Sequence, residues 1–384
     1  MAKKKILIRI GSLRHGGAEK VLTTFLKNIP PDKYEIDLLL NLKFGKYLKD
    51  IPDWITIYYL NKGEMITTNR PLEIPVKIYR KVYQKILKIF PKLLYTFILK
   101  NKKYDIELIA NHSLLNEMLK SPLHSSKKVV WIHSDIFNND EVLESDLQNY
   151  FEADKILVIS DKIKEEFNKI SRNESDKNKI VKIFNPIDSN EIINLSLENI
   201  DTEHLFSNCK LKTFVSVGTV YPAKGFDRLI NVHKKLIDEG FYHNILIVGD
   251  GYDLGKIASL IKNLDVENTV KLIGFKENPY PLIKNADYYI LSSRYEGYPT
   301  VLFEALTLGK PLIATDVSGA AEILENGKLG MVVENSEEGI YNGIKKFLES
   351  PEVPLAYSKE MNDKKLPFSL KNAVNSLTNI FDNL

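Results

Sequence analysis

Short apolar runs alternate along the whole chain with longer stretches in which apolar positions recur every three or four residues. Each run has the length of a strand and is apolar on both faces, which is typical of parallel strands covered by helices on either side. The alternation predicts doubly wound parallel α/β sheets, and two series of runs predict two Rossmann-like domains. The predicted strands are 5–10, 35–40, 55–60, 106–110, 128–133 and 155–160 in the first series, and 213–218, 244–249, 269–274, 287–293 and 311–316 in the second.

A polar stretch without strong periodicity, 186–212, separates the two series. We place the boundary near residue 188, which gives an N-terminal domain over 1–188 and a C-terminal domain over 189–368. The length of 384 residues suits two domains rather than one. The remaining tail, 369–384, has the apolar spacing of a helix.

Composition narrows the class of protein. The net charge of +3 favours no particular partner, and the single cysteine, Cys209, excludes a disulfide within the chain and favours a reducing compartment. Arg9 interrupts the first apolar run, which therefore predicts a buried strand rather than a signal peptide. Because no run reaches about 18 apolar residues, we expect no membrane-spanning helix. These features together predict a cytoplasmic protein.

One segment has an unusual charge pattern. Residues 76–103 contain nine Lys or Arg and no acid, with apolar and aromatic residues between them at helical spacing. A basic amphipathic helix of this kind suits an anionic membrane surface, here the inner face of the cytoplasmic membrane. The alternative is a surface helix whose apolar side packs on the sheet. Nucleic acid is not expected as a partner, since no reading module accompanies the charge. The candidate membrane or acceptor contacts are Arg80, Lys81, Lys85, Lys88 and Lys92.

Two glycine-containing loops follow the first strand of each series. In "GSLRHGGAEKVL", Gly16 and Gly17 stand where a helix begins, so that backbone N–H groups could approach a phosphate. The spacing is not the dinucleotide fingerprint, and a tight strand-to-helix turn explains the glycines equally well. In "VSVGTVYPAKGFDRLI", Gly218 ends a strand and Lys224 precedes a helix, where its ammonium could reach a diphosphate. A solvated lysine is the alternative.

The third motif is "RYEGYPTVLFEALTLG", which carries two acids eight positions apart, Glu296 and Glu304. Pro299 suits the first position of a helix and Gly309 its end. The free N–H groups at this helix start would form an anion site at the carboxyl edge of the sheet. A carboxylate accepts two hydrogen bonds from a vicinal diol, so one acid could hold a ribose and the other a sugar.

The pattern Glu-x7-Glu, followed by "GKPLIATDVSGAAEIL", resembles glycosyltransferase family 4, retaining enzymes of the GT-B fold. The motifs "GGAEKVL", "FNPID", "VGTVYPAKGFDRLI", "LIVGDG" and "VKLIGF" follow in the family's order over nearly the whole chain. The resemblance implies that Glu304 binds the ribose, Glu296 the donor sugar and Lys224 the diphosphate, and that His133 lies near the reacting sugar. It also implies that the tail helix, 369–384, crosses back to the first domain. The catalytic candidates are His133, Glu296 and Lys224, and the donor-binding candidates are Gly16, Gly17, Gly218, Thr219, Lys224, Phe275, Glu296, Gly297, Tyr298, Thr300, Val301 and Glu304.

The chain departs from the family at Thr219, where an Arg usually accompanies the lysine on the diphosphate. A lost charge-assisted contact to phosphate is worth about 1.5–3 kcal/mol, which Arg294 or Arg14 could replace. No Asp-x-Asp motif is present, and we expect neither a metal nor another cofactor, because cationic and amide-lined phosphate sites neutralise the leaving group.

These features predict a retaining, metal-independent hexosyltransferase. It would move a hexose or N-acetylhexosamine from a nucleotide sugar, with a UDP-sugar favoured, to a lipid-linked or growing glycan of the bacterial cell surface. The alternative that Thr219 favours is a non-catalytic GT-B partner subunit of another glycosyltransferase. An epimerase of the same fold would not need the basic segment. The sequence leaves the donor sugar, the acceptor, the linkage and the oligomeric state open.

Overall fold

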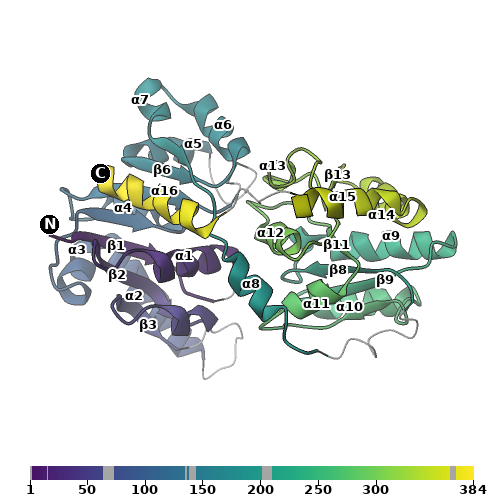
Figure 1. Ribbon diagram of the computed structural model, residues 1–384. Coiled ribbons are helices and arrows are strands. Elements are labelled where there is room, and N and C mark those ends of the chain that lie inside the picture. The colour runs from purple at the N-terminus through teal and green to yellow at the C-terminus, as the bar shows by residue number, and fades with distance from the viewer. Residues whose placement is uncertain are drawn as a thin grey trace. The chain divides into compact units, whose positions relative to one another are not determined.

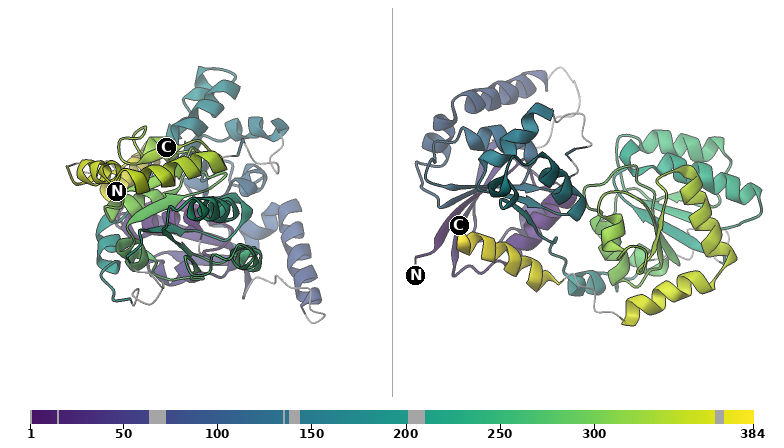
Figure 2. Two further views of the ribbon diagram at one scale, coloured as in Figure 1. Left: turned by 90° about the vertical axis from the view of Figure 1, so that its right-hand side faces the viewer. Right: turned by 90° about the horizontal axis from the view of Figure 1, so that it is seen from above.

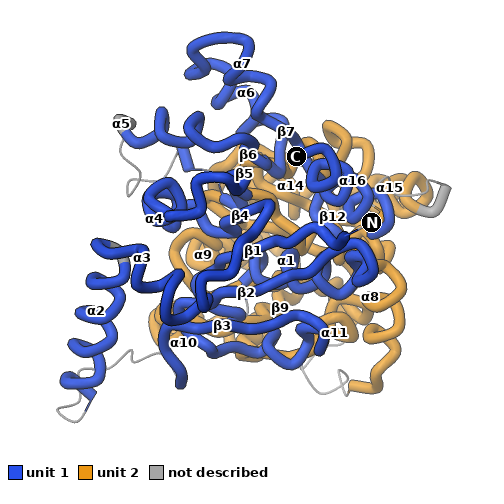
Figure 3. Tube along the Cα trace, turned by 90° about the vertical axis from the view of Figure 1, so that its left-hand side faces the viewer, with its two compact units in different colours: residues 1–186, 370–384 blue, residues 187–369 orange. Residues whose placement is uncertain are grey.

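The computed structural model describes residues 2–14, 16–63, 73–134, 136–137, 144–200, 210–363 and 369–384. The chain forms two compact units (Figure 3): residues 1–186 with 370–384, and residues 187–369. The change of unit therefore lies within two residues of the boundary expected at 188, and the C-terminal tail belongs to the first unit. Cys209 lies outside the described residues.

Each unit is built on a parallel sheet. The described part of unit 1 has a seven-stranded sheet in the order β3-β2-β1-β4-β5-β6-β7, and that of unit 2 a six-stranded sheet in the order β10-β9-β8-β11-β12-β13. The order reverses beside β1 and β8, as in doubly wound folds. The strands are β1 Lys4–Ile10, β2 Tyr34–Lys43, β3 Thr56–Lys62, β4 Ile106–Ile109, β5 Lys127–Ile132, β6 Lys155–Val158, β7 Ile180–Lys182, β8 Thr213–Val217, β9 Asn244–Val248, β10 Val270–Leu272, β11 Tyr288–Leu291, β12 Leu312–Thr315 and β13 Met331–Val333.

Helices connect and cover the strands of both sheets (Figure 1). Those of unit 1 are α1 Gly17–Asn28, α2 Ile74–Ile89, α3 Pro91–Leu93, α4 Leu115–Leu119, α5 Glu144–Leu147, α6 Asp161–Ile170, α7 Glu174–Lys177 and α16 Leu370–Asn383. Those of unit 2 are α8 Ser189–Leu195, α9 Phe226–Asp238, α10 Leu254–Asn263, α11 Tyr280–Asn285, α12 Thr300–Thr307, α13 Ala320–Ile323, α14 Glu337–Glu349 and α15 Glu352–Asp363.

All eleven strands predicted from the sequence are present, and the predicted fold class is confirmed. The pattern missed β7 and β13. Each has three residues and is only partly buried, so neither produces a continuous apolar run.

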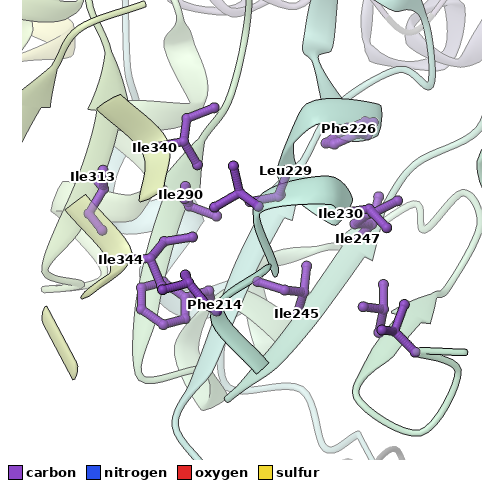
Figure 4. Close-up of a cluster of buried hydrophobic side chains, with 14 of the residues drawn as sticks. Phe214, Phe226, Leu229, Ile230, Ile245, Ile247, Ile290, Ile313, Ile340 and Ile344 are labelled. Atoms are coloured by element: carbon purple, nitrogen blue, oxygen red, sulfur yellow. The ribbon is translucent and has the colours of Figure 1, made fainter. Parts of the chain in front are cut away.

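The core of unit 2 lies between its sheet and the helices α9 and α14 (Figure 4). Phe214 of β8, Leu229 of α9 and Ile344 of α14 are fully buried within one cluster. Burying side chains of this size contributes about 1.5–3 kcal/mol each. This packing holds the carboxyl ends of β8 and β11, and the loops that follow them, on a rigid support.

Helix α16 packs on unit 1 (Figure 2). The ring of Phe381 is fully buried and makes edge contacts with Phe25 and Tyr34. Lys4 Nζ donates to the carbonyl of Phe381 at 2.7 Å. The tail thus completes the first unit, although 366 residues separate Lys4 from the start of the helix.

The basic segment 76–103 is not one continuous helix. Helix α2 ends at Ile89, and a short turn at Pro91–Leu93 and a π-helix at Leu94–Ile98 follow. Pro91 explains the break, because it has no N–H to donate and disfavours helical backbone in the residue before it; Phe90 has φ −117° and ψ 70°. Among the described helices, none is long and apolar enough to cross a membrane.

Candidate functional site

The carboxyl ends of β8, β9 and β10 form one edge of the unit 2 sheet, and a glycine follows within two residues of each end. Gly249 has φ +155°, and a Cβ atom there would lie 1.8 Å from the carbonyl oxygen of Gly218. Its N–H donates to the carbonyl of Gly274 at 2.9 Å. Among the glycines of "SVG", "IVG" and "LIG", Gly249 therefore lets the ends of β8 and β9 approach closely, whereas a Cβ atom on Gly274 would meet nothing within 4 Å. Thr219 and Phe275 directly follow two of them, at the same edge.

Lys224 and Glu296 meet at this edge. Lys224 Nζ lies 2.6 Å from Glu296 Oε1, and the hydroxyl of Ser293 donates to the same oxygen at 2.6 Å. The lysine side chain is 22% exposed and the glutamate 12%, so the ion pair is accessible without being fully solvated. The aliphatic part of Lys224 runs past Gly218, with 3.5 Å between its Cδ and a Cβ built on that glycine. The two predicted catalytic residues of unit 2 are thus in direct contact.

Arg294, one of the two arginines considered as a substitute at Thr219, is engaged by protein groups. Its guanidinium makes a bidentate pair with Asp227, at 2.7 and 2.8 Å, and also donates to the carbonyl of Pro222 at 2.8 Å. The pair holds the pKa of the Asp227 carboxyl below its usual range, chiefly through the hydrogen bond from Arg294. The charge of Arg294 is thus paired at the start of α9, and the expectation that Arg294 could serve the diphosphate stays a prediction.

Helix α12 carries the second acid. Pro299 is the residue before the helix rather than its first residue, and Gly309 has φ +66°, which is the left-handed conformation expected where a helix ends. Glu304 is only 6% exposed, and the hydroxyl of Tyr280 lies 3.5 Å from its Oε1. Thr300 and Val301 are the first two residues of α12, so their backbone N–H groups stand among those that lack a partner within the helix.

Tyr289 is a buried tyrosine on β11 whose hydroxyl reaches Val217 of β8. Its ring is fully buried on β11, and its hydroxyl lies 3.4 Å from both the N–H and the carbonyl of Val217. Burial, and beyond it the negative charges of Glu304 and Glu296, hold the pKa of Tyr289 well above its usual range. The charges of both carboxylates therefore act on one buried phenol of β11.

Tyr298, a donor-binding candidate, has a buried side chain. The residue is 6% exposed, and its ring lies against Gly319, where a Cβ atom would be 2.3 Å from Cδ2 of the ring. Its hydroxyl donates to Glu322 Oε1 at 3.3 Å. The ring thus anchors the loop to α13, and only the backbone of Gly297 and Tyr298 is left to line a ligand.

In unit 1, Gly16 and Gly17 lie where α1 begins, as predicted. A Cβ atom on Gly16 would lie 2.2 Å from Oε2 of Glu19, so the carboxylate of Glu19 is folded over the helix start. Burial raises the pKa of Glu19. This contact is with the far end of a flexible side chain that can move aside, so it does not distinguish the tight-turn interpretation from a phosphate-binding loop.

His133 directly follows β5 and stacks on Trp131, with ring centroids 4.5 Å apart. Its Nε2 is buried and has no hydrogen-bond partner among the described residues. Burial lowers the pKa of His133 to about 3, so the imidazole is neutral at physiological pH. A buried nitrogen without a partner costs about 1–3 kcal/mol, and such groups call for a functional explanation.

The basic candidates differ in their surroundings. Lys81, Lys85 and Lys92 are exposed, whereas Arg80 donates to the carbonyl of Lys62 at 2.8 Å and so faces its own unit. Lys88 lies within α2, and its side chain lies outside the described residues. Among the described residues, no group of three or more His, Cys, Asp or Glu could hold a metal ion.

The chain is similar to glycosyltransferases in sequence and in fold. The family described as "Glycosyl transferases group 1" matches residues 199–364. The chain has the GT-B fold of glycosyltransferases, and its resemblance to the glycosyl transferases of group 1 is confirmed, whereas its assignment to family 4 stays a prediction.

Individual proteins resemble the chain over nearly its whole length. The N-acetylgalactosamine-N,N'-diacetylbacillosaminyl-diphospho-undecaprenol 4-alpha-N-acetylgalactosaminyltransferase of Campylobacter jejuni is 28% identical, over 95% of this chain and 96% of that protein. The amylovoran biosynthesis glycosyltransferase AmsD of Erwinia amylovora is 24% identical over 88% of each. The crystal structure of Anabaena HepE in complex with UDP-glucose superposes with a TM-score of 0.73 at 19% identity, covering 99% of this chain and all of that one.

Sequence reasoning did not single out several residues that shape this site. Ser293 and Tyr289 lie in or beside the strand "DYYILSS", which was interpreted only as a strand. Arg228 and Asn335 contact the Glu296 loop from other elements. A polar Ser-Ser pair at the end of an otherwise apolar strand is a signal that could have drawn attention to Ser293.

Proposed function

We propose that the protein is a retaining glycosyltransferase that transfers a hexose or N-acetylhexosamine from a nucleotide sugar to a lipid-linked or growing glycan. A UDP-sugar is the favoured donor. The observation that carries this proposal is the meeting of Lys224 with Glu296, 2.6 Å apart, in the loop that leads into α12, the helix that carries Glu304. A cation, two diol-binding acids and a helix start are the groups that a sugar nucleotide requires.

Each part of the donor has a matching group in unit 2. Glu304 would accept hydrogen bonds from the ribose, and Glu296 from the hydroxyls of the sugar. The amides at Thr300 and Val301, together with Lys224, would hold the diphosphate between them. Phe275, 49% exposed beyond β10, would contact the base. In unit 1, the Gly16–Gly17 turn and His133 stay candidate contacts of the donor.

In the reaction, the bond from the anomeric carbon to the diphosphate oxygen breaks while the acceptor hydroxyl bonds to the same face of that carbon. The leaving diphosphate takes the acceptor's proton, so no side-chain nucleophile is needed. Lys224 and the helix amides stabilise the negative charge that develops on the leaving group. We propose that this charge stabilisation requires no metal ion.

The relatives support the proposed substrates. The Campylobacter relative is named for transfer to a diphospho-undecaprenol-linked sugar and the Erwinia relative for amylovoran biosynthesis, while HepE was crystallised with UDP-glucose. We accordingly propose a role in bacterial surface polysaccharide or glycolipid synthesis. A polyprenol-linked acceptor would keep the enzyme working at a membrane.

Helix α2 supports the proposed membrane contact. Leu87 and Tyr83 pack into the apolar cluster of unit 1 beside Leu94 and Tyr95. A second apolar face stays exposed, with Ile78 57%, Tyr79 65%, Val82 50%, Ile86 42% and Ile89 58% exposed. Lys81 and Lys85, one helical turn apart, flank this face.

A helix that exposes apolar residues next to lysines fits the surface of an anionic bilayer, where the apolar face enters the acyl boundary and the lysines reach the headgroups. Packing on the sheet uses only the Leu87 side and so leaves the exposed face unexplained. We propose that unit 1 docks peripherally on the inner face of the cytoplasmic membrane through this helix.

A second candidate function is a non-catalytic partner subunit of another glycosyltransferase. Thr219 favours it, and the engagement of Arg294 by Asp227 removes one way of restoring the missing charge. The contact between Lys224 and Glu296 argues for catalysis, since a subunit without a donor has no need of it.

Transfer onto a bacterial lipid extract, followed by NMR of the product's anomeric proton, tests the proposal. We expect the donor's α-configuration to be kept, with a rate that EDTA leaves unchanged. An inverted product would contradict the retaining mechanism, and loss of activity in EDTA would contradict metal independence. Absence of product with every donor would favour the partner subunit.

A further inference from the structure

Three polar residues that are not catalytic candidates connect two loops of unit 2. One loop, 218–225, carries Lys224, and the other, 292–299, carries Glu296. The three residues are Arg228 at the start of α9, Arg294 in the loop after β11, and Asn335 between β13 and α14. Each of the three side chains forms hydrogen bonds with other protein groups. Their arrangement bears on how accurately Lys224 and Glu296 are held.

Arg228 joins α9 to the end of β11. It is 5% exposed, and its Nε donates to the carbonyl of Ser292 at 2.9 Å while NH2 donates to that of Ser293 at 2.6 Å. Thr315 of β12 donates its hydroxyl to the carbonyl of Ser293 at 2.7 Å. Buried carbonyls require such partners, so the backbone that leads to Glu296 is fixed from two neighbouring elements.

Asn335 uses both ends of its amide. Its Oδ1 accepts a hydrogen bond from Arg228 NH2 at 2.6 Å, and its Nδ2 donates to the carbonyl of Arg294 at 2.8 Å. Linking the Arg228 guanidinium to the Arg294 carbonyl takes a side chain that both accepts and donates a hydrogen bond. An amide does both, whereas a carboxylate could only accept. Asn335 therefore links the Arg228 side chain to the loop backbone two residues before Glu296.

Arg294 completes the connection to the Lys224 loop. Its side chain contacts Asp227 and the carbonyl of Pro222, and its N–H donates to the carbonyl of Ala223 at 2.7 Å. The hydroxyl of Ser292 donates to the carbonyl of Lys224 at 2.9 Å. At the neighbouring Gly225, φ is +64° and a Cβ atom would lie 2.2 Å from the carbonyl oxygen of Ser292. The two loops are thus joined along their whole length.

We propose that Arg228, Arg294 and Asn335 are positioning residues that hold Lys224 and Glu296 in register for the donor's diphosphate and sugar. This inference rests on the proposed function for its effect on turnover. The physical reason is that misplacing a reacting group by about 1 Å costs on the order of 100-fold in rate. The three residues act through the loops that they join.

Asn335 is the most informative position to change, because it is exposed and its replacement should not disturb the core. In Asn335→Ala the buried group that loses a partner is the NH2 of Arg228. Asn342→Ala is the matched control: Asn342 is an exposed asparagine on α14 that bonds to Glu338 of the same helix, at 3.5 Å. Asp227→Ala frees Arg294 and supplies a second test from the opposite side of the connection. Arg228→Ala is less suitable, since it would remove the Arg228 donor from the carbonyl of Ser292 and leave that of Ser293 with the Thr315 hydroxyl alone.

Hydrogen exchange of the amides in 293–298 is the first readout, because it does not depend on activity. We expect exchange about tenfold faster in Asn335→Ala and Asp227→Ala than in the wild type or Asn342→Ala, with the melting temperature little changed. Equal exchange in all four proteins would overturn the proposal.

Steady-state release of nucleoside diphosphate is the second readout. We expect kcat to fall at least about tenfold in Asn335→Ala while UDP affinity, set by Glu304 and the base side of the site, stays within about threefold. An unchanged kcat would overturn the inference. A wild type that releases no diphosphate would instead contradict the proposed function, and exchange alone would then decide whether the loops are held as described.

Discussion

Lys224 Nζ lies 2.6 Å from Oε1 of Glu296, although 72 residues separate them in the sequence. Ser293 donates its hydroxyl to the same oxygen. The lysine is thereby held with its ammonium beside the start of the Glu296 loop, and the carboxylate keeps its Oε2 for other partners. This arrangement accounts for why "AKG" and "RYEGYP" occur together in one chain.

Removing the ammonium should therefore impair turnover. In Lys224→Ala we expect kcat to fall by about 100- to 1,000-fold, the loss found when a donor that stabilises the leaving group is deleted. Lys234→Ala is the matched control, since Lys234 is an exposed lysine of α9 that pairs with Asp238. Diphosphate release by both variants is the measurement, and equal rates would contradict the role given to Lys224.

Removing the second acid should weaken nucleotide binding. We expect Glu304→Ala to lose about 1.5–3 kcal/mol of UDP affinity, measured by calorimetry, because two hydrogen bonds from the ribose to a charged group would be lost. Tyr280→Phe is the control, as it removes only the protein hydroxyl that lies 3.5 Å from Glu304. If Glu304→Ala binds UDP as the wild type does, the ribose contact lies elsewhere.

The exposed apolar face of α2, with the lysines beside it, predicts binding to anionic membranes. In Lys81→Glu/Lys85→Glu we expect sedimentation with phosphatidylglycerol-containing vesicles to be lost, because about 1 kcal/mol of attraction per lysine turns into repulsion. Ile78→Glu/Val82→Glu should have the same effect through the apolar face. UDP binding should be unaffected in both variants.

Controls for this experiment come from α15. Lys359→Glu and Leu355→Glu change an exposed lysine and a leucine that is 67% exposed, away from α2. They should sediment like the wild type. Continued vesicle binding by the α2 variants, or its loss in the α15 variants, would refute docking through α2.

A buried histidine pair should make unit 2 sensitive to acid. His233 Nδ1 lies 3.0 Å from His243 Nε2, and His243 Nδ1 lies 2.8 Å from the carbonyl of Phe241. Burial, and then the neighbouring His243, lower the pKa of His233 to about 2, and burial lowers that of His243 to about 4. Both values lie below the 6.5 of the unfolded chain, so the unfolded state binds more protons and stability falls as the pH drops below 6.5.

Between pH 6.5 and 5 we expect a loss on the order of 2 kcal/mol per histidine. Urea unfolding monitored by exchange of the α9 amides is the measurement. His133, whose pKa is also lowered, acts in the same direction in unit 1. The variant His233→Gln should therefore reduce the pH dependence in unit 2 alone, and a stability of unit 2 that is flat from pH 7 to 5 in the wild type would contradict this account.

The sequence predicted most of the scaffold, because buried parallel strands and helix ends leave local signals. The strand "NILIVG" and the helix end at Gly309 illustrate this. The break in α2 could have been foreseen from Pro91, which a continuous amphipathic interpretation passed over. The short strand β13 left no comparable pattern, since its three residues are only partly buried.

The sequence predicted those site residues that stand within a short, recognisable motif. Glu296, Glu304 and Lys224 stand in such motifs. The engagement of Arg294 was not predictable, because its partner Asp227 lies 67 residues away and only the fold brings them together. For the same reason the amide of Asn335 and the burial of the Tyr298 ring required the structure.

The most direct test of the central claim is nucleoside diphosphate release from a panel of UDP-, GDP- and ADP-sugars, with and without a bacterial lipid extract. The account predicts release from one UDP-sugar that the lipid extract stimulates and that Glu304→Ala abolishes. No release from any donor, together with no binding of UDP, would contradict it and would mean that Thr219 marks a chain without transferase activity.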